Sequence, residues 1–450
     1  MYLTETHQQI REMTRKFADE VIRPQAEELD REERFAAEIY QQMGELGLFG
    51  ITVPEEYGGV GLDAVAYAVV MEELSRGYAS IADQCGLVEL LGTLLSKYGD
   101  DAQRAQWLPG LLNASLKGAY CITEAGAGSD VSGIKTTATR TADGWVLNGS
   151  KLWIHNAPVA DVAFVLARTD KDAGHRGMSI FIVDCSRDGV SRGPKEHKMG
   201  QRSSQVGELH FNQVRLPAHA LLGPENRGFH IMMSVLNKGR VGIGALAVGI
   251  ARAGLEAAIE YAKQREQFGK PIADFQGVQF MLADIAKDTE AARLLVHSAA
   301  YKIDTDAADT SIACSMAKCF AGDVAVQHSG NAVQIFGGGG YIRGVEVERL
   351  YRDAKITQIY EGTNQIQRMI IGRNHHGDSA RWGSINGDDK CSTVGAGYRT
   401  IADGSGKAMC PIRQFCGCKA PGSFTVSLNS TQYQRAIVNR DHTIRNGGAT

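Results

Sequence analysis

Apolar residues recur at helical spacing through the first part of the chain. The opening segment has no run of uninterrupted apolar residues, and its apolar positions fall on one face of a helix: Leu3, Ile10, Met13, Phe17 and Val21. Further helical segments are predicted around 67–75 and 87–97, separated by short clusters of Gly and Pro that are typical of loops. Residues 1–117 are therefore predicted to form a helical domain.

Between residues 118 and 223 the pattern changes to short β-rich runs. The dipeptide Asp143-Gly144 lies between the runs 136–139 and 145–147, and Asp-Gly in that setting strongly favours a tight hairpin. Two more short apolar runs stand between polar breaks, at 163–167 and 179–183. This stretch is predicted to be a middle β-domain.

Helical periodicity returns from residue 224 to residue 375. One long helix is expected to carry an apolar face made of Leu246, Ile250, Ala253, Ala257 and Tyr261. Further helices are predicted over 280–303 and 313–333. An α–β–α order without βαβ alternation argues against a Rossmann fold. The predicted class is α+β.

The last stretch, residues 376–450, has no sustained apolar period and is rich in Gly, Ser, Thr and Asn. Such a composition cannot bury enough apolar surface to fold, so this tail is predicted to be disordered. The sudden loss of pattern also resembles a frameshifted or read-through C-terminus. Three of its cysteines invite a metal reading, but their spacing matches no common zinc motif and no His pair accompanies them: Cys410, Cys416 and Cys418. No metal site is predicted.

Composition excludes several classes of protein. The 450 residues hold 48 Lys and Arg against 51 Asp and Glu, a net charge of −3, which excludes a broad basic surface for nucleic acid. No uncharged apolar run approaches the roughly 18 residues of a spanning helix, so no membrane span is predicted. Nine irregularly spaced cysteines are not a disulfide framework, and the N-terminus lacks the pattern of a signal peptide. A bacterial-type cytoplasm is expected, with a mature organellar protein as the alternative.

Four segments are candidates for ligand contact. Glycines allow a ligand to approach the backbone closely, hydroxyls can hold polar ring atoms or phosphates, and an indole suits a flat heteroaromatic partner. The first three segments have a structural reading as well: a tight loop, a core Trp and a charged helix end. The fourth is not a P-loop, because no Gly-Lys-Ser/Thr follows its glycines. The four segments are CITEAGAGSD at 121–130, KLWIHN at 151–156, REQFGKP at 265–271 with Gln276, and QIFGGGGY at 334–341.

A fifth segment, IYEGTNQ at 359–365, places one carboxylate between an apolar pair and a glycine. Desolvation makes Glu361 a stronger base than a solvated Glu, and Gly362 leaves room for a substrate atom beside it. The alternative is an exposed loop Glu, which is where most glutamates lie.

Each of these segments alone is a weak indication of function, but their combination and order along the chain are specific. CITEAGAGSDVSG, and QIFGGGGY followed through ERLYRD to IYEGTNQIQR, fit two diagnostic patterns, and KMGQRSS and LLGPENRGF agree with them. From its N-terminus to about Arg373 the chain resembles the acyl-CoA dehydrogenase family. The resemblance implies a helical domain (1–117), a β-barrel-like domain (118–223) and a four-helix bundle (224–375).

The resemblance also implies FAD, bound between the β-domain and the C-terminal helices across a dimer interface, in a homotetramer built as a dimer of dimers. By match of motif, two groups of residues would contact the flavin cofactor. Those of the same subunit are Cys121, Thr123, Ser129, Trp153, His155 and Tyr360. Those reaching the neighbouring subunit's FAD are Arg265, Phe268, Gln276, Gln334 and Gly338, with Thr363 and Gln365 further along. Ser129, Asn237, Arg240 and Gly362 would contact the substrate.

Glu361 stands where the short- and medium-chain branches of the family carry the catalytic base. Other branches place that Glu just before Arg240, where this chain has Gly239. The implied reaction is α,β-dehydrogenation of an acyl-CoA to a trans-2-enoyl-CoA. Glu361 takes the α-proton beside Arg240 while hydride leaves for flavin N5, and an electron-transfer flavoprotein then accepts the electrons.

Three positions depart from the family pattern. His155 replaces a Thr or Ser whose hydroxyl bonds the flavin, Asn237 replaces an Asp that contacts the CoA adenine, and Gly344 replaces an acidic residue. Two alternatives keep the same fold, namely an acyl-CoA oxidase that uses O₂ and an enzyme that eliminates a group from the β-carbon. A third is a non-enzymatic binding protein. The acyl chain of the substrate cannot be read from the sequence.

Overall fold

The computed structural model describes residues 3–375. The N-terminal part is helical, and a single π-helical turn, Ala18–Ile22, extends its first helix. The α-helices are α1 (Glu5–Phe17), α2 (Ala26–Glu32), α3 (Ala37–Glu45), α4 (Ala64–Gly77), α5 (Ala79–Tyr98) and α6 (Asp101–Leu112). α1 and α6 both begin with a capping box, in which Thr4 and Asp100 accept from backbone N–H groups three residues on.

Eight strands of the middle part form one sheet in the order β6-β7-β3-β2-β4-β5-β8, with β1 paired to β4. Their bounds are β1 (Gly118–Cys121), β2 (Thr137–Thr141), β3 (Gly144–His155), β4 (Val162–Arg168), β5 (Met178–Asp184), β6 (Val190–Arg192), β7 (Val206–Pro217) and β8 (Leu221–Leu222). The predicted hairpin is confirmed, because Thr141 pairs with Gly144 across a two-residue turn. Gly144 has φ +147°, and a Cβ there would lie 2.2 Å from the carbonyl oxygen of Leu216.

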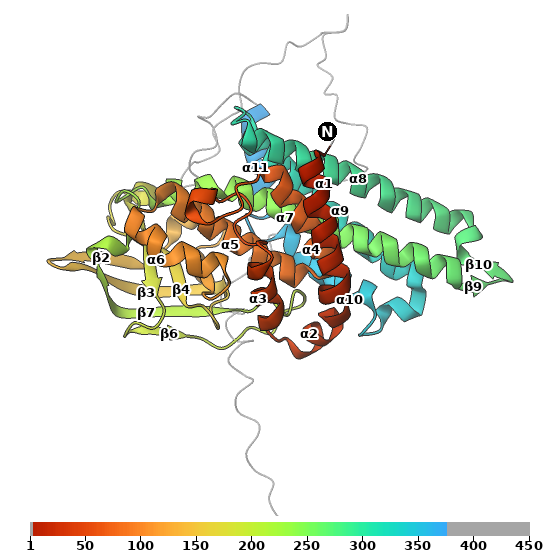
Figure 1. The fold of residues 1–450 in the computed structure, drawn as a ribbon, viewed down its shortest axis with the longest axis horizontal. Coiled ribbons are helices and arrows are strands. Elements are labelled where there is room, and N and C mark those ends of the chain that lie inside the picture. The colour runs from red at the N-terminus through yellow and green to blue at the C-terminus, as the bar shows by residue number, and fades with distance from the viewer. Residues whose placement is uncertain (1–2, 376–450) are drawn as a thin grey trace, which may run out of the picture. The chain divides into compact units, whose positions relative to one another are not determined.

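The remaining part is again helical, which confirms the predicted α+β class. Three long helices, two short ones and a small hairpin make it up: α7 (Gly228–Gln264), β9 (Glu266–Gln267), β10 (Lys270–Pro271), α8 (Gln276–Asp304), α9 (Thr310–Phe336), α10 (Glu346–Ala354) and α11 (Asn364–His375). In Figure 1 the sheet lies at one end of this unit and the β9–β10 hairpin at the other, with α4 and α5 against α7 between them.

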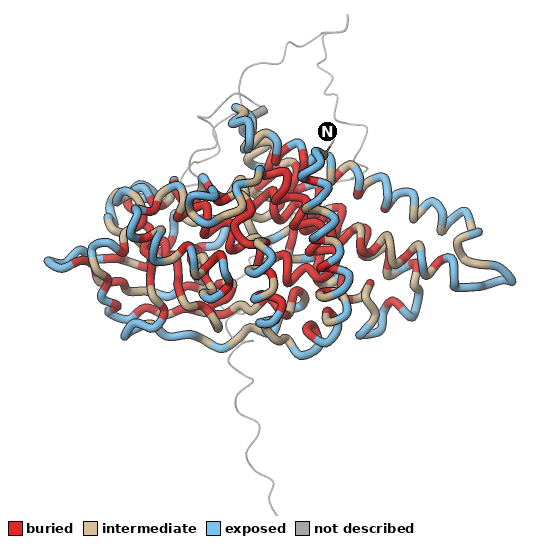
Figure 2. Tube along the Cα trace, viewed as in Figure 1, coloured by how far each residue is buried: buried red, intermediate tan, exposed pale blue. Residues whose placement is uncertain are grey.

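The hydrophobic core is continuous where the two helical parts meet. Leu246, Ile250 and Ala253 of α7 are fully buried, as the periodicity predicts, and Tyr261 stacks on Phe336 with ring centroids 4.1 Å apart. Figure 2 shows the buried residues concentrated in the middle of the unit and in the sheet. α7 is long and apolar enough to cross a membrane, but 72 % of its most apolar window is buried inside the protein, as in a core helix.

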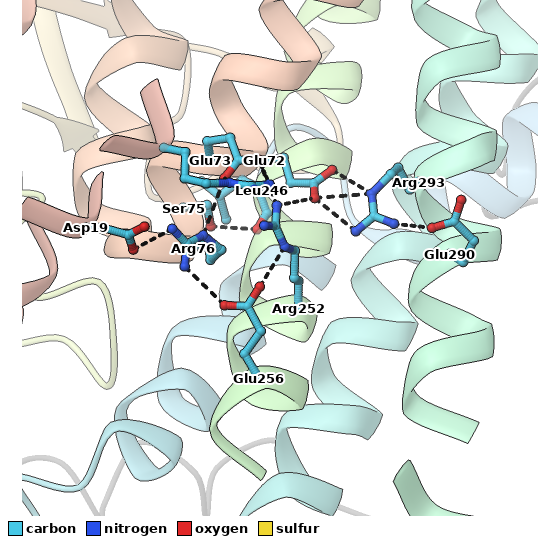
Figure 3. A network of polar contacts seen from close by, with 11 residues as sticks. Asp19, Glu72, Glu73, Ser75, Arg76, Leu246, Arg252, Glu256, Glu290 and Arg293 are labelled. Atoms are coloured by element: carbon cyan, nitrogen blue, oxygen red, sulfur yellow. Dashed lines mark hydrogen bonds and ion pairs between the residues drawn. The ribbon is translucent and has the colours of Figure 1, made fainter. Parts of the chain in front are cut away.

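A buried ionic network joins α7 to its neighbours (Figure 3). Arg252 of α7 donates to Glu73 of α4 at 2.8 Å, and Arg293 of α8 donates to Glu72 of α4 at 2.9 Å. Arg76 bonds both Glu73 and Glu256. Glu72 and Glu73 each pair with at least two arginines, so the buried charges compensate one another as a network and not as isolated pairs. The network links α4 to α7 and α8.

Some sequence expectations fail or fall outside the described residues. Of the apolar face predicted for α1, Phe17 is buried as expected, whereas Met13 is exposed; His7 and Thr14, which were not predicted, are buried beside Phe17. The five cysteines described are free and buried: Cys85, Cys121, Cys185, Cys314 and Cys319. Two predictions concern residues outside the described part of the chain: the disorder of 376–450, and the absence of a metal site at Cys410, Cys416 and Cys418.

Candidate active site

Glu361 lies in the short loop that leads into α11. Its backbone adopts φ +54°, in the left-handed region, and Gly362 follows with φ +84°. Non-glycine residues seldom adopt this conformation, and such strain persists only where the surroundings hold it. The side-chain amide of Gln367 donates to the carbonyl oxygens of Glu361 at 3.1 Å and Gly362 at 2.9 Å. The loop is therefore fixed by its own helix.

The carboxyl group of Glu361 points at α7. A Cβ built on Gly239 would lie 2.7 Å from Glu361 Oε2, and that oxygen is buried without a hydrogen-bond partner among the described residues. Burial raises the pKa of Glu361 to about 7, against the opposing charges of Arg240 and Lys318 and with a smaller upward push from Asp83. A carboxylate with a pKa near neutrality is a competent general base.

Arg240 is the cation that the resemblance placed beside the base. It is 8 % exposed, it donates to Asn237 Oδ1 at 2.9 Å, and its Nε has no partner among the described residues. Burial lowers the pKa of Arg240, and the charge of Glu361 opposes that shift. The structure therefore brings together Glu361, Gly362, Arg240 and Asn237.

The charge of the Glu361 carboxylate acts on three buried tyrosines. They come from α4, β1 and the loop itself, and the charge of Glu361 contributes to raising the pKa of each: Tyr67, Tyr120 and Tyr360. Burial is the main cause of these shifts, so all three phenols stay neutral. Tyr360 accepts a hydrogen bond from Gln201 Nε2 at 3.3 Å, which ties the loop to the segment before β7.

The candidate flavin residues of the β-domain cluster at the ends of β1 and β3. Trp153 is 63 % exposed with φ +54°, which rules out the core reading of this indole. The backbone N–H of Leu152 donates to the carbonyl of Thr123 at 2.9 Å. Nothing lies within 4 Å of a Cβ placed on Gly126 or Gly128. An exposed indole face beside an open glycine loop fits a flat, phosphorylated cofactor such as FAD.

Two buried residues that the sequence reading missed anchor this loop. Lys151 is almost fully buried, and its Nζ donates to the carbonyl of Ile122 and to Glu124 Oε1, both at 2.8 Å. Glu124 also accepts from the backbone N–H groups of Lys135 and Thr136.

Cys121 and Ser129 are both expected at the flavin, but the first is buried and the second is exposed. Cys121 is fully buried, backbone included, in the core of the sheet, and burial raises the pKa of its thiol, so no part of this residue is exposed to a ligand. Ser129 is exposed on the loop.

Three polar side chains hold His155. Its Nε2 lies 2.9 Å from Gln84 Nε2 and 2.9 Å from Ser204 Oγ, and its Nδ1 lies 3.4 Å from Asp83 Oδ2. A reciprocal amide pair with Asn156 orients the Gln84 amide so that one N–H faces His155 Nε2. The proton of the ring is then on Nδ1, facing Asp83, and burial lowers the pKa of His155. In this arrangement the imidazole has no N–H free for a flavin.

The candidate residues of the second flavin group that lie before α10 are far from Glu361. Arg265, Phe268 and Gln276 are exposed at the β9–β10 end of the bundle, with Phe268 94 % exposed. Gln334 and Gly338 lie where α9 ends, and an apolar cluster packs the ends of α7, α8 and α9 together. This end lies remote from the sheet in Figure 1.

Beyond Glu361, Thr363 caps α11, because its Oγ1 accepts from the backbone N–H of Ile366 at 3.2 Å. Gln365 is exposed on the first turn of that helix. Among residues 3–375 no group of three or more His, Cys, Asp or Glu side chains could hold a metal ion.

Three domain families match the chain in sequence order. They are the N-terminal, middle and C-terminal domains of acyl-CoA dehydrogenases, at residues 4–115, 119–214 and 226–376. The chain belongs to the acyl-CoA dehydrogenase family. Its relatives and structural neighbours in this family are oxidoreductases, and the protein is accordingly an enzyme of the acyl-CoA dehydrogenase type.

Individual relatives are similar along nearly their whole length. The 3-(aryl)acrylate reductase of Clostridium sporogenes is 43 % identical over 377 residues, covering 83 % of this chain and 99 % of that protein. The butyryl-CoA dehydrogenase of Megasphaera elsdenii is 41 % identical, with a TM-score of 0.81 over 83 % of this chain and 99 % of its own. A structure described as the electron transferring flavoprotein of Acidaminococcus fermentans contains a chain that is 42 % identical, with a TM-score of 0.82 over 84 % of this chain and 100 % of that chain.

Proposed function

We propose that this enzyme uses FAD to oxidise an acyl-CoA thioester to the trans-2-enoyl-CoA, with Glu361 as the base that removes the α-proton. The observation that carries the proposal is the Glu361 carboxyl itself. Its Oε2 is buried without a partner among residues 3–375, lies against Gly239 and has a pKa raised to about 7. A buried oxygen without a partner costs free energy, so its retention is a mark of function.

The α-carbon of a thioester is a weak acid, so the developing negative charge needs stabilisation in a dry site. The charge of Arg240 beside Glu361 favours ionisation of the carboxylate before the proton is taken. The neutral, buried phenols of Tyr67, Tyr120 and Tyr360 help to exclude water. The space that a Cβ on Gly362 would occupy is filled by Gln367, whose Nε2 would lie 2.7 Å away, so only the backbone of Gly362 could contact the thioester. Bound FAD supplies the acceptor for the hydride that leaves the β-carbon.

Residues of the chain would hold FAD in two groups. Trp153, Thr123, Ser129 and Tyr360 would contact the flavin within one subunit, and Cys121 would support them from inside the sheet. A second subunit would supply the other residues, all exposed except Thr363: Arg265, Phe268, Gln276, Gln334, Gly338, Thr363 and Gln365. Support comes from the separation of the two groups within one chain, since Phe268 lies exposed at the far end of the bundle. A cofactor shared in this way requires at least a dimer, and the family resemblance extends this proposal to a homotetramer built as a dimer of dimers.

We further propose an electron-transfer flavoprotein as electron acceptor and a cytoplasmic location. The similarity to a chain in a structure described as an electron transferring flavoprotein supports the first. The burial of every described cysteine as a free thiol suits a reducing compartment.

The test is anaerobic mixing of the purified holoenzyme with saturated acyl-CoA thioesters of increasing length. We expect loss of the visible absorbance of oxidised flavin and a product lighter by two hydrogens with a trans double bond. An acyl-CoA oxidase would yield one hydrogen peroxide per product in air without an added acceptor. A β-eliminating enzyme would lose the substituent of a β-substituted acyl-CoA. Retained flavin absorbance with every thioester would contradict the proposal.

A second candidate function is the reverse reaction on an aryl acrylate. The 43 % identity to the 3-(aryl)acrylate reductase of C. sporogenes favours it. Reoxidation of the chemically reduced enzyme by an aryl acrylate or its CoA thioester would support this direction.

A further inference from the structure

Lys318 lies in the middle of α9 with a fully buried side chain. Its Nζ donates to the carbonyl oxygen of Gly362 at 2.8 Å and to Asn364 Oδ1 at 3.0 Å. Asn364 is itself held, because its Nδ2 donates to the carbonyl of Cys319 and to Asp323 Oδ1. The ammonium group thus contacts the residue that follows Glu361 and the first residue of α11.

The hydrogen bonds of Lys318 do not explain why a charged group is buried at this position. Both acceptors of Lys318 are neutral, and burying an ammonium group without an ion pair is costly. The carbonyl of Gly362 already accepts from Gln367 Nε2 at 2.9 Å, so a second donor is not needed to satisfy it. Burial lowers the pKa of Lys318 to about 8, and the charge of Glu361 is the main opposing influence. The charge is therefore retained for a reason other than packing.

We propose that Lys318 is a positioning residue for the base: its ammonium group holds the Glu361–Gly362 turn and keeps the Glu361 carboxylate ionised. The proposal rests on the proposed role of Glu361. The proposed effect of Lys318 is electrostatic. A positive charge near a carboxyl group favours its ionised form, whereas a neutral hydrogen-bond donor at the same place does not.

Other groups act on the same carboxylate and must be held constant in any test. The charged ones are Arg240 of α7, which lowers the pKa of Glu361, and Asp83 of α5, which raises it. The neutral phenols face it from α4, β1 and the loop: Tyr67, Tyr120 and Tyr360. On the Lys318 side the further titratable groups are Cys319 and Asp323. None of these is changed by a substitution at Lys318.

The experiment compares three holoenzyme variants with the wild type. Lys318→Gln keeps an N–H donor and removes the charge, Lys318→Met removes both, and Lys355→Gln removes an exposed lysine charge six residues before Glu361. Both Lys318 variants are expected to fold, because Gly362 keeps its bond from Gln367. The ionisation of Glu361 is followed by carbon-13 NMR of protein labelled in the glutamate carboxyls. The signal is assigned by its loss in Glu361→Gln.

We expect Lys318→Gln and Lys318→Met to make Glu361 a roughly tenfold weaker acid, whereas Lys355→Gln leaves it unchanged because exposed charges are screened. The rate of flavin reduction by an acyl-CoA should then fall about fivefold near pH 7 and recover at higher pH, where the carboxylate is ionised in every variant.

An unchanged titration of Glu361 in Lys318→Gln would overturn the proposal, as would a loss of rate that is equal at all pH values. The titration does not depend on turnover. If no thioester reduces the wild-type flavin, the proposed function fails while the NMR result still decides whether Lys318 controls the ionisation of Glu361.

Discussion

Replacing Gly239 with alanine tests whether the Glu361 carboxyl lies against α7. The added Cβ would meet Glu361 Oε2 at 2.7 Å and Cδ at 3.1 Å, with Leu90 Cδ2 at 3.4 Å on its other side. Ordinary van der Waals contact begins near 3.4 Å, so the carboxyl must retreat by about 0.7 Å. A misplacement of about 1 Å in a reacting group can cost about 100-fold, so kcat/KM should fall roughly 10- to 100-fold.

The fold should tolerate this change. Alanine stabilises a helix interior by about 1 kcal/mol relative to glycine, and the atoms that must move are at the end of the flexible Glu361 side chain. The assay is the rate of anaerobic flavin reduction by an acyl-CoA, set beside the free energy of unfolding from urea titration. Gly254→Ala is the matched control on the same helix, since its Cβ would meet only Ala332 Cβ at 3.4 Å. Gly254→Ala should keep the wild-type rate. Full activity of Gly239→Ala would refute the placement of the carboxyl.

Three further predictions concern the base and the cofactor. Glu361→Gln should raise the free energy of unfolding by roughly 2–3 kcal/mol near pH 8 and by about zero below pH 4 in urea titrations. The folded-state pKa of Glu361, about 7, lies above the ordinary value of 4.5, so its stabilising contribution is present at low pH and is lost as the pH rises through 7. Trp153→Ala should lower the FAD content after gel filtration at least tenfold while the circular dichroism spectrum is unchanged; full retention of FAD would exclude the indole as a flavin contact. Phe268→Ala should also release FAD, and mixing it with Trp153→Ala subunits should restore part of the FAD content if the two residues act across subunits.

The sequence predicts the fold wherever local patterns decide it. The apolar period of α7 gives its buried face, and Asp143-Gly144 gives the β2–β3 turn, because both signals are read within a few residues. Met13 shows the limit of this reasoning. It shares the spacing of Ile10 and Phe17, yet α1 packs against α4 so that Phe17 is buried together with the polar His7 and Thr14, while Met13 is left exposed.

The site could be predicted only in part. Glu361 was found from its motif, whereas the residues that set its ionisation lie far away in sequence: Lys318 is 44 residues from Gly362, and Asp83 comes from the first helical part. Such partners follow from tertiary packing, which a single sequence does not encode locally. A signal existed, since Lys318 is the single charge in the apolar stretch ACSMAKCFAG, and a charge there favours a buried polar partner.

The most direct test of Glu361 as the base is a single-turnover comparison of wild type with Glu361→Gln. Both proteins would be loaded with FAD and mixed anaerobically with the preferred acyl-CoA, and the loss of flavin absorbance would be followed in time. The glutamine keeps the size and the loop contacts of the side chain but cannot accept the α-proton. We expect equal FAD content and a rate lower by about 100- to 10,000-fold. A rate equal to wild type would contradict the assignment.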